Sequence, residues 1–262
     1  MTRTSAGQER GDAETDFGFR RVRAAEHAGL VGAVFDSVAD RYDLMNDLMS
    51  GGLHRLWKWA LVDRLKPAPA MRLIDVAGGT GDVAFRYLDR LAERNLKPAA
   101  PATICDPNAA MLRIGRRRAI DAGHLYGLSF VCAKAEALPF ADRAADACTI
   151  SFGLRNVTDR TAALMEMHRL LAIGGHFLCL EFSPRVPPLL APLYDAYSYR
   201  VLPWLGERVA GDRDAYRYLA ESIRRFPAPE TLAAEMRAAG FGNVTWRALS
   251  GGIVAIHSGW RL

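Results

Sequence analysis

The stretch Arg72-Leu-Ile-Asp-Val-Ala-Gly-Gly-Thr-Gly-Asp82 decides the fold of this chain. Its apolar beginning, residues 73–76, predicts a short buried strand, and a helical pattern follows from Val83. The glycines between them tolerate positive φ angles and let a ligand approach the backbone without a Cβ in the way. The free N–H groups at the start of the next helix favour a bound polar group. We therefore expect a strand–loop–helix unit that binds a nucleotide-type cofactor on an α/β sheet.

The acids around this loop indicate which cofactor it binds. The spacing Gly79-x-Gly81-x-x-Ala84 also fits the dinucleotide fingerprint. Asp75 and Asp82, however, would place two carboxylates beside a pyrophosphate, and like charges repel. S-adenosylmethionine instead carries an ammonium and a sulfonium, which attract carboxylates. We predict S-adenosylmethionine as the cofactor, with Asp75, Gly79 and Gly81 in its site. A nicotinamide-dependent oxidoreductase, or a tight turn without a ligand, remains as an alternative.

The rest of the chain alternates between strand and helix patterns, which predicts a doubly wound, mostly parallel sheet. Two late runs, 244–249 and 253–257, are split by Gly251-Gly252 and predict an antiparallel hairpin at the sheet edge. Such a hairpin favours the methyltransferase version of this α/β, Rossmann-like fold. The expected parallel strands are 73–76, 102–105, 128–132, 145–150 and 177–181, and the expected helices between them are 83–96, 109–122 and 162–171, the last closed by Gly174-Gly175.

The length of 262 residues suits one large domain with an insert. We expect residues 1–25 to be a flexible N-terminal arm and residues 26–262 a single domain. Within it, 26–66 should form N-terminal helices, and the segment 184–226, rich in Tyr, Pro and Arg, should form a helical cap over the site. No apolar run approaches the roughly 18 residues that span a bilayer, and the N-terminus lacks a signal peptide. A cytoplasmic location is expected.

The charge pattern and the cysteines exclude other classes of function. The net charge is +5, but acids and bases alternate along the chain, and no aromatic–basic interleaving indicates nucleic-acid binding. The four cysteines match no zinc or redox spacing, so no metal site is predicted, and we expect them to be buried. The densest basic cluster should form a solvated helix face, or attract anionic lipid headgroups: Arg113, Arg116, Arg117 and Arg118.

Further candidate site residues lie at the ends of the predicted strands, where ligands bind in open α/β sheets. Asp106 ends the second strand, where a carboxylate can accept the ribose hydroxyls of adenosine; the alternative is a helix N-cap. Lys134 and Ala135 follow the third strand, where the adenine should lie, and Ser151 follows the fourth. Arg155 offers a permanent cation that would stabilise a phenolate or enolate oxygen. Its alternative role is an Arg–carboxylate pair that holds the loop.

Several blocks carry a resemblance to one family. The segment Tyr42-Asp-Leu-Met-Asn-Asp-Leu-Met-Ser-Gly-Gly-Leu-His-Arg-Leu-Trp57 resembles the signature of the ubiquinone/menaquinone biosynthesis C-methyltransferases. The other blocks similar to this family are 75–82, 135–140, 150–157, 180–183 and 216–223. The resemblance implies a class I methyltransferase fold. It also implies transfer of a methyl group from S-adenosylmethionine to a ring carbon of a 2-methoxy-6-polyprenyl-1,4-benzoquinol or of demethylmenaquinol.

By this resemblance, the residues that contact the cofactor are Thr80, Asp106, Lys134, Ala135 and Ser151. Arg155 and Asp82 are the implied catalytic residues, and His54 is a competing base whose more favoured role is structural. The predicted substrate-binding residues are Tyr42, Asn46, Asn156, Tyr194 and Tyr197.

The implied substrate has a long apolar tail, so we expect the protein to meet the inner membrane peripherally or to join a quinone-biosynthesis complex. The arm segment Asp16-Phe-Gly-Phe19 favours ubiquinone without excluding a dual role. The sequence leaves open whether the chain forms a homodimer. A different small-molecule methyltransferase and a non-catalytic quinone-binding scaffold are the remaining alternatives.

Overall fold

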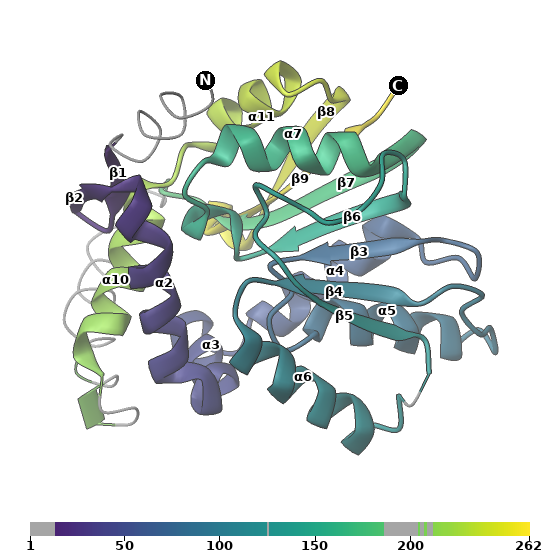
Figure 1. Cartoon of the computed structure of the whole chain (residues 1–262), viewed down its shortest axis with the longest axis horizontal. Coiled ribbons are helices and arrows are strands. Elements are labelled where there is room, and N and C mark those ends of the chain that lie inside the picture. The colour runs from purple at the N-terminus through teal and green to yellow at the C-terminus, as the bar shows by residue number, and fades with distance from the viewer. Residues whose placement is uncertain (1–13, 125, 186–203, 205–206, 209–211) are drawn as a thin grey trace, which may run out of the picture.

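The computed structural model describes residues 14–124, 126–185, 204, 207–208 and 212–262. Its centre is a seven-stranded sheet with helices on both faces (Figure 1). The strands follow the order β5-β4-β3-β6-β7-β9-β8 across the sheet. Their bounds are β3 Leu73–Val76, β4 Ala102–Asp106, β5 Leu128–Cys132, β6 Ala145–Ser151, β7 Leu171–Phe182, β8 Gly242–Leu249 and β9 Val254–Trp260.

The first five strands of this sheet, from β5 to β7, run parallel, and β9 pairs antiparallel with both β7 and β8. This confirms the predicted α/β fold class, including the antiparallel hairpin at the edge. Several boundaries differ from the expectation, and the start of β7 differs most. Gly174 and Gly175 do not close a helix but lie within β7, where their backbones exchange hydrogen bonds with Arg261 near the C-terminus.

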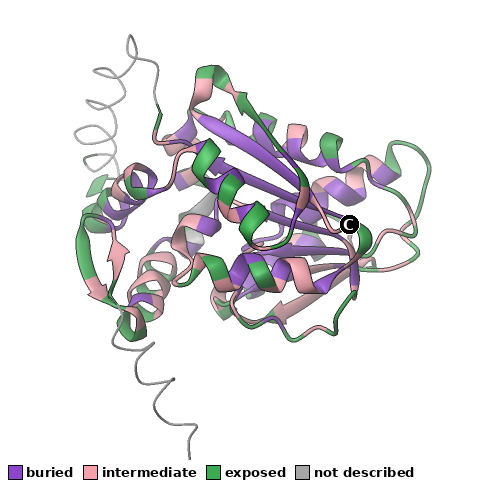
Figure 2. Ribbon diagram, turned by 90° about the horizontal axis from the view of Figure 1, so that it is seen from above, coloured by how far each residue is buried: buried purple, intermediate pink, exposed green. Residues whose placement is uncertain are grey.

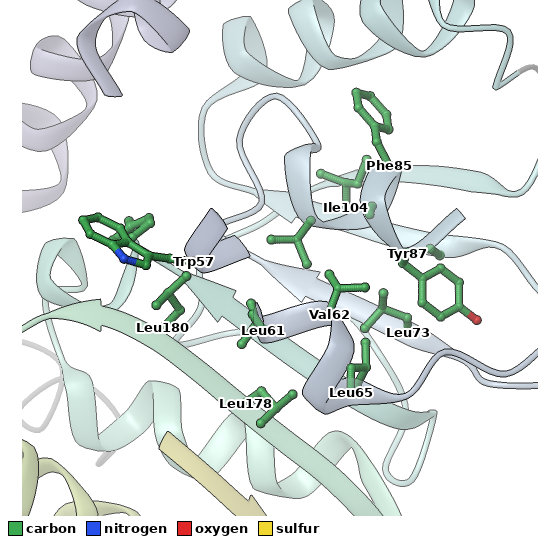
Figure 3. Close-up of a cluster of buried hydrophobic side chains, with 14 of the residues drawn as sticks. Trp57, Leu61, Val62, Leu65, Leu73, Phe85, Tyr87, Ile104, Leu178 and Leu180 are labelled. Carbon is green, nitrogen blue, oxygen red and sulfur yellow. The ribbon is translucent and has the colours of Figure 1, made fainter. Parts of the chain in front are cut away.

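Side chains of neighbouring residues in the central strands enter two different cores. Leu73 of β3 faces the core that α4 His54–Leu65, α5 Asp82–Ala92 and α6 Ala109–Asp121 cover. The next residue, Ile74, faces the core under α7 Arg160–Leu170 and α11 Pro229–Ala238. Because helices cover both faces, the strands are apolar on both sides. Figure 2 shows them buried at the centre of the molecule, and Figure 3 shows Leu61, Val62 and Leu65 of α4 gathered beside Leu73 and Leu178.

The described part of the expected N-terminal arm is folded. Residues Glu14–Phe17 (β1) and Arg20–Arg23 (β2) form an antiparallel hairpin, and α2 Ala24–Val38 follows at once. The Phe17 ring stacks on Tyr218 of α10 Arg213–Arg225, with ring centroids 4.2 Å apart. At the hairpin turn Gly18 has a φ of +59°, and a Cβ there would collide with the Glu221 carboxylate, which accepts a hydrogen bond from the Phe19 N–H. The hairpin is therefore held by long-range contacts that its polar sequence does not reveal.

The helices α2, α3 Tyr42–Ser50 and α10 stand together beside one end of the sheet (Figure 1). The short 3-10 turns η1 Ala39–Arg41 and η2 Leu154–Asn156 lie against these helices, and a third, η4 Ser250–Gly252, joins β8 to β9. More than half of the predicted cap segment 184–226, including Tyr194 and Tyr197, lies outside the described residues, and α10 is the longest part of it that the structure describes. Among the described helices, none has both the length and the apolar character that crossing a bilayer requires.

Candidate cofactor and substrate site

A cavity of about 470 Å³ lies at the carboxyl ends of β3, β4, β5 and β6, under helix α2. Five residues predicted from sequence line it: Gly79, Asp106, Lys134, Ala135 and Asn156. Helix α2 adds Ala28, Val31 and Phe35 together with Asp36, so the wall that it forms is largely apolar. The cavity thus joins a polar edge of the sheet to an apolar helix, as a site for a polar cofactor and an apolar substrate requires.

The glycine loop is tied directly to the next strand. The Gly79 N–H donates to Asp106 Oδ2 at 2.9 Å, and the Gly78 N–H donates to the Cys105 carbonyl at 3.1 Å. Gly79 and Gly81 have φ angles of 55° and 91°, in the left-handed region that favours glycine. This geometry exposes the backbone of Gly79 to the cavity.

Asp106 presents a buried carboxylate to the cavity. Its Oδ1 accepts the Asn108 N–H at 2.8 Å, while Asn108, not Asp106, caps α6. The N-cap alternative for Asp106 is therefore wrong. Burial raises the pKa of Asp106 to about 6, despite the backbone donors of Asn108 and Gly79, so the group is ionised at neutral pH. Its spare lone pairs can accept hydroxyl groups of a ligand.

Asp75 lies behind the loop and does not line the cavity. It is 1% exposed, its Oδ1 accepts the Thr149 hydroxyl at 2.7 Å, and its Oδ2 is buried without a partner. Burial raises the pKa of Asp75 to about 7. A Cβ on Gly78 would lie 2.8 Å from that Oδ2. Asp75 therefore lies close behind Gly78 without entering the cavity wall, and its contact with the cofactor stays a prediction.

Three cations from three helices converge on Asp82, the first residue of α5. Lys58 Nζ of α4 lies 2.8 Å from Asp82 Oδ2, and Arg118 of α6 and Arg86 of α5 lie 3.0 and 3.4 Å from Oδ1. Arg118 also donates to Thr80 Oγ1 at 2.6 Å. The sequence did not indicate this role for Lys58 or Arg118. Arg118 was expected on a solvated helix face, but it contacts Asp82 and Thr80 instead.

This network does not support the predicted catalytic role of Asp82. Burial alone would raise the pKa of Asp82, but Lys58, Arg86 and Arg118 outweigh it and hold the pKa well below its usual range. A carboxylate so stabilised is a poor proton acceptor. Asp82 also lines a different cavity, with His54 and Arg86, and Thr80 turns its hydroxyl to Arg118. Through Arg118, Asp82 and Thr80 tie the glycine loop to α6.

Arg155 forms the Arg–carboxylate pair that was the alternative to its catalytic role. Its Nη1 lies 2.9 Å from Glu181 Oε2, and the two side chains are 5% and 1% exposed. The same Nη1 donates to the Phe152 carbonyl at 2.7 Å. Arg155 lines a neighbouring cavity of about 610 Å³, which shares Lys134 and Thr158 with the first. In this position Arg155 braces the loop after β6, and Asn156 is the residue that faces the cofactor cavity.

The other polar side chains around the loop after β6 either form hydrogen bonds or are buried without a partner. Asn156 Oδ1 accepts the hydroxyl of Tyr218 at 3.0 Å. Ser151 Oγ is buried without a partner, although Ser151 is not among the residues lining the cavity. Thr158 Oγ1 lies 2.9 Å from His27 Nδ1 of α2, and the Thr158 N–H donates to Glu136 at 3.0 Å. These contacts fasten α2 over the cavity.

The other predicted residues have structural surroundings. His54 Nε2 lies 2.9 Å from Asp47, burial lowers the pKa of His54, and His54 is absent from the cofactor cavity, which favours its structural role. Asn46 has a buried Nδ2 without a partner. Tyr42 begins α3, and its side chain is not among the parts that the structure describes.

Cys132 is exposed, contrary to expectation, while the other three cysteines are buried. Among the described residues, no cluster of His, Cys, Asp or Glu could hold a metal ion.

Comparison with known proteins identifies the family. Residues 22–261, nearly the whole chain, match the ubiE/COQ5 methyltransferase family. The chain belongs to this family. A relative from Paracoccus denitrificans, named ubiquinone/menaquinone biosynthesis C-methyltransferase UbiE, is 54% identical over 95% of this chain and 97% of its own length. A protein of the same name from Methylobacterium nodulans is 55% identical over 96% of this chain and 98% of its own.

Solved structures agree on the fold of this ubiE/COQ5 family member. The [4+2]-cyclase SpnF superposes with a TM-score of 0.63 at 18% identity, covering 88% of this chain and 94% of SpnF. A SAM-dependent methyltransferase from Thermotoga maritima gives a TM-score of 0.60 at 19% identity over 88% and 99% of the two chains.

The cavity fits S-adenosylmethionine, the cofactor of this family. A carboxylate, Asp106, stands at the end of the second parallel strand, where ribose hydroxyls bind in related sheets. A Cβ on Gly79 would lie 3.3 Å from Met111, so glycine keeps the loop open beside the cavity. Lys134 and Ala135 line the part of the cavity after β5, where the adenine is expected. Because the Lys side chain carries no acceptor, an adenine amino group there would need a backbone carbonyl as its acceptor.

Proposed function

We propose that this protein transfers the methyl group of S-adenosylmethionine to a ring carbon of a polyprenylated benzoquinol or of demethylmenaquinol. The observation that carries the proposal is one cavity lined both by Asp106 and Gly79 and by Asn156 and apolar side chains of α2. The names of the near full-length relatives support the substrate class. When bound, the cofactor supplies an electrophilic methyl group.

The side chains of this protein would act mainly by position. Asp106 orients the ribose, and the Gly79 backbone approaches the amino-acid end of the cofactor. Asn156, in the turn η2 after β6, can donate to a ring oxygen that gains negative charge as the ring carbon attacks. Val31 and Phe35 of α2 exclude water from the same space. Alignment of this kind can lower a barrier by several kcal/mol.

The long apolar tail of such a quinol must leave the enzyme toward a lipid phase. We propose that the tail leaves among α2, α3 and α10, because a third apolar cluster lies between these helices, with Val38, Met45 and Tyr216. The protein would therefore meet the inner membrane as a peripheral protein, or take the quinol within a quinone-biosynthesis complex.

The test is mass spectrometry of quinols after incubation with methyl-labelled S-adenosylmethionine. The substrates are 2-methoxy-6-prenyl-1,4-benzoquinol and demethylmenaquinol, each offered reduced and oxidised. We expect label on a ring carbon of a reduced substrate only. The variant Asp106→Asn is the control, because it removes the protein carboxylate that would accept the ribose hydroxyls of the cofactor while keeping the size of the side chain. Tight cofactor binding without label on either quinol would refute the proposed acceptor.

A further inference from the structure

We propose that Tyr218 is a positioning residue, which fixes the side-chain amide of Asn156 with its N–H₂ group available to the cavity. The inference rests on the proposed function, because it assigns the cavity a hydrogen-bond donor for a ring oxygen of the quinol. Asn156 lines the cavity, and Tyr218 is absent from the described residues that do so. Tyr218 would therefore act on the reaction through Asn156 alone.

The contact between them is direct and rigid. The Tyr218 hydroxyl donates to Asn156 Oδ1 at 3.0 Å, across 62 positions of sequence. The Tyr218 side chain belongs to a residue only 4% exposed, and Phe17 stacks on its ring at an interplanar angle of 20°. A ring clamped in this way between the hairpin and its own helix keeps its hydroxyl at one place. Tyr218 thus connects α10 to the loop after β6.

The Phe152 carbonyl decides which way the amide points. This oxygen accepts a hydrogen bond from Arg155 Nη1 at 2.7 Å and lies 3.5 Å from Asn156 Nδ2. A carbonyl can only accept, so it would repel the amide oxygen if the amide were flipped. The Tyr218 hydroxyl can donate to the oxygen on the other side. The amide carries two N–H groups, and one of them remains for a ligand in the cavity.

The hydroxyl of Tyr218 is a constant donor. Burial raises the pKa of Tyr218 well above its usual range, so the proton stays on the oxygen over the whole working pH range. Without this donor, the Asn156 amide would lose the hydrogen bond to its Oδ1 and keep only the long contact from its Nδ2 to the Phe152 carbonyl. The amide would then sample other orientations, and the donor would face the quinol for part of the time.

Kinetics of Tyr218→Phe test the proposal. We expect kcat for the quinol to fall about tenfold, the effect of one lost hydrogen bond, while the Kd of S-adenosylmethionine stays within about twofold. Tyr87→Phe is the matched control, because the buried Tyr87 hydroxyl lies 2.9 Å from the Ala68 carbonyl, away from the cavity. It should lose stability and keep kcat. An unchanged kcat in Tyr218→Phe would overturn the proposal.

A double-mutant cycle separates positioning from a general structural effect. In the Asn156→Ala background, Tyr218→Phe should change kcat less than about twofold, because the group it positions is gone. Asn156→Asp keeps the acceptor for Tyr218 but removes the N–H donors, so it should lose activity although the contact survives. Losses that add fully in the double variant would contradict the proposed coupling.

A spectroscopic measurement tests the positioning without any substrate. The side-chain amide protons of Asn156, followed by ¹⁵N NMR in the protein without quinol, should shift and exchange faster in Tyr218→Phe than in wild type or Tyr87→Phe. Unchanged amide resonances would refute the role of Tyr218. If wild type methylated neither quinol, the proposed function would fail, and the amide resonances would still decide whether Tyr218 positions Asn156.

Discussion

Replacing Lys58 with methionine tests the buried charge network under the cofactor loop. The change keeps the apolar stem and removes the ammonium that lies 2.8 Å from Asp82 Oδ2, where the side chains are 5% and 12% exposed. Breaking a buried ion pair from one side costs about 3–5 kcal/mol. Arg118 and Arg86 stay within 3.0 and 3.4 Å of Asp82, so we expect a smaller loss, about 2–3 kcal/mol of unfolding free energy.

The loss should depend on pH with a definite sign. Burial alone would raise the pKa of Asp82, but its three cations hold that pKa well below the unfolded value. A carboxylate with a lowered folded pKa adds stability above the unfolded pKa and loses that contribution as the pH falls. The difference in unfolding free energy between wild type and Lys58→Met should therefore be full at pH 7 and shrink below about pH 4.

Urea unfolding followed by circular dichroism at pH 7 and pH 3 measures both effects. The matched control is Arg185→Met, because Arg185 pairs with Glu230 at 2.7 Å but the two side chains are 64% and 49% exposed. That control should lose no more than about 1 kcal/mol. Equal losses in the two variants at pH 7 would refute the reasoning. A deficit in Lys58→Met that does not shrink at pH 3 would show that the charge of Asp82 is not its source.

Three further predictions concern the cavity and its walls. Because burial raises the pKa of Asp106 to about 6 and ribose binding needs the ionised form, calorimetry should show the Kd of S-adenosylmethionine rising about tenfold from pH 7 to pH 5. Asp106→Asn should bind S-adenosylmethionine weakly at both pH values. A rise in Kd that persists in this variant would come from the titration of another group. Glu181→Gln leaves the buried Arg155 guanidinium without its counter-charge, so calorimetric unfolding should show a loss of about 3 kcal/mol, or roughly 6–12 °C in Tm; an unchanged Tm would contradict this. Gly153→Ala places a Cβ 2.5 Å from that of Ala77 and should cost about 1–3 kcal/mol in urea unfolding, with recovery in the double variant Gly153→Ala/Ala77→Gly. Failure of that rescue would mean that the clash is not the cause.

The sheet was predictable because its strands are local, apolar runs bounded by turns. The expected strands 73–76 and 128–132 match β3 and β5 residue for residue. The hairpin at residues 14–23 escaped prediction because its strands are polar and it is held by Tyr218 and Glu221, some two hundred positions away. A pattern within one segment carries no information about such partners.

The site was predictable where it consists of backbone and strand ends. Gly79 and Asp106 follow from the sequence because a glycine loop and an acid at a strand end have fixed places in this fold. The family resemblance gave Asp82 a catalytic role, and the cations that lie against its carboxylate were not apparent from the sequence. Lys58 and Arg118 lie on helices 24 and 36 positions from Asp82, and their inward orientation follows only from packing. Arg155 was similarly ambiguous until Glu181 was placed beside it.

The hairpin of β1 and β2 has a practical consequence for preparing this protein, because its Phe17 ring contacts both His27 of α2 and Tyr218 of α10. Deleting residues through Arg23, to remove a segment that looks dispensable in sequence, would take away Phe17 and the turn at Gly18, and with them the anchor of the cavity's roof. An affinity tag fused close to Glu14 would press on the same anchor. Leu262 at the other terminus is 70% exposed, so a purification tag there, after a spacer that spares Arg261, leaves the roof intact. Activity measured on N-terminally shortened or tagged protein would report on that anchor as much as on the chemistry.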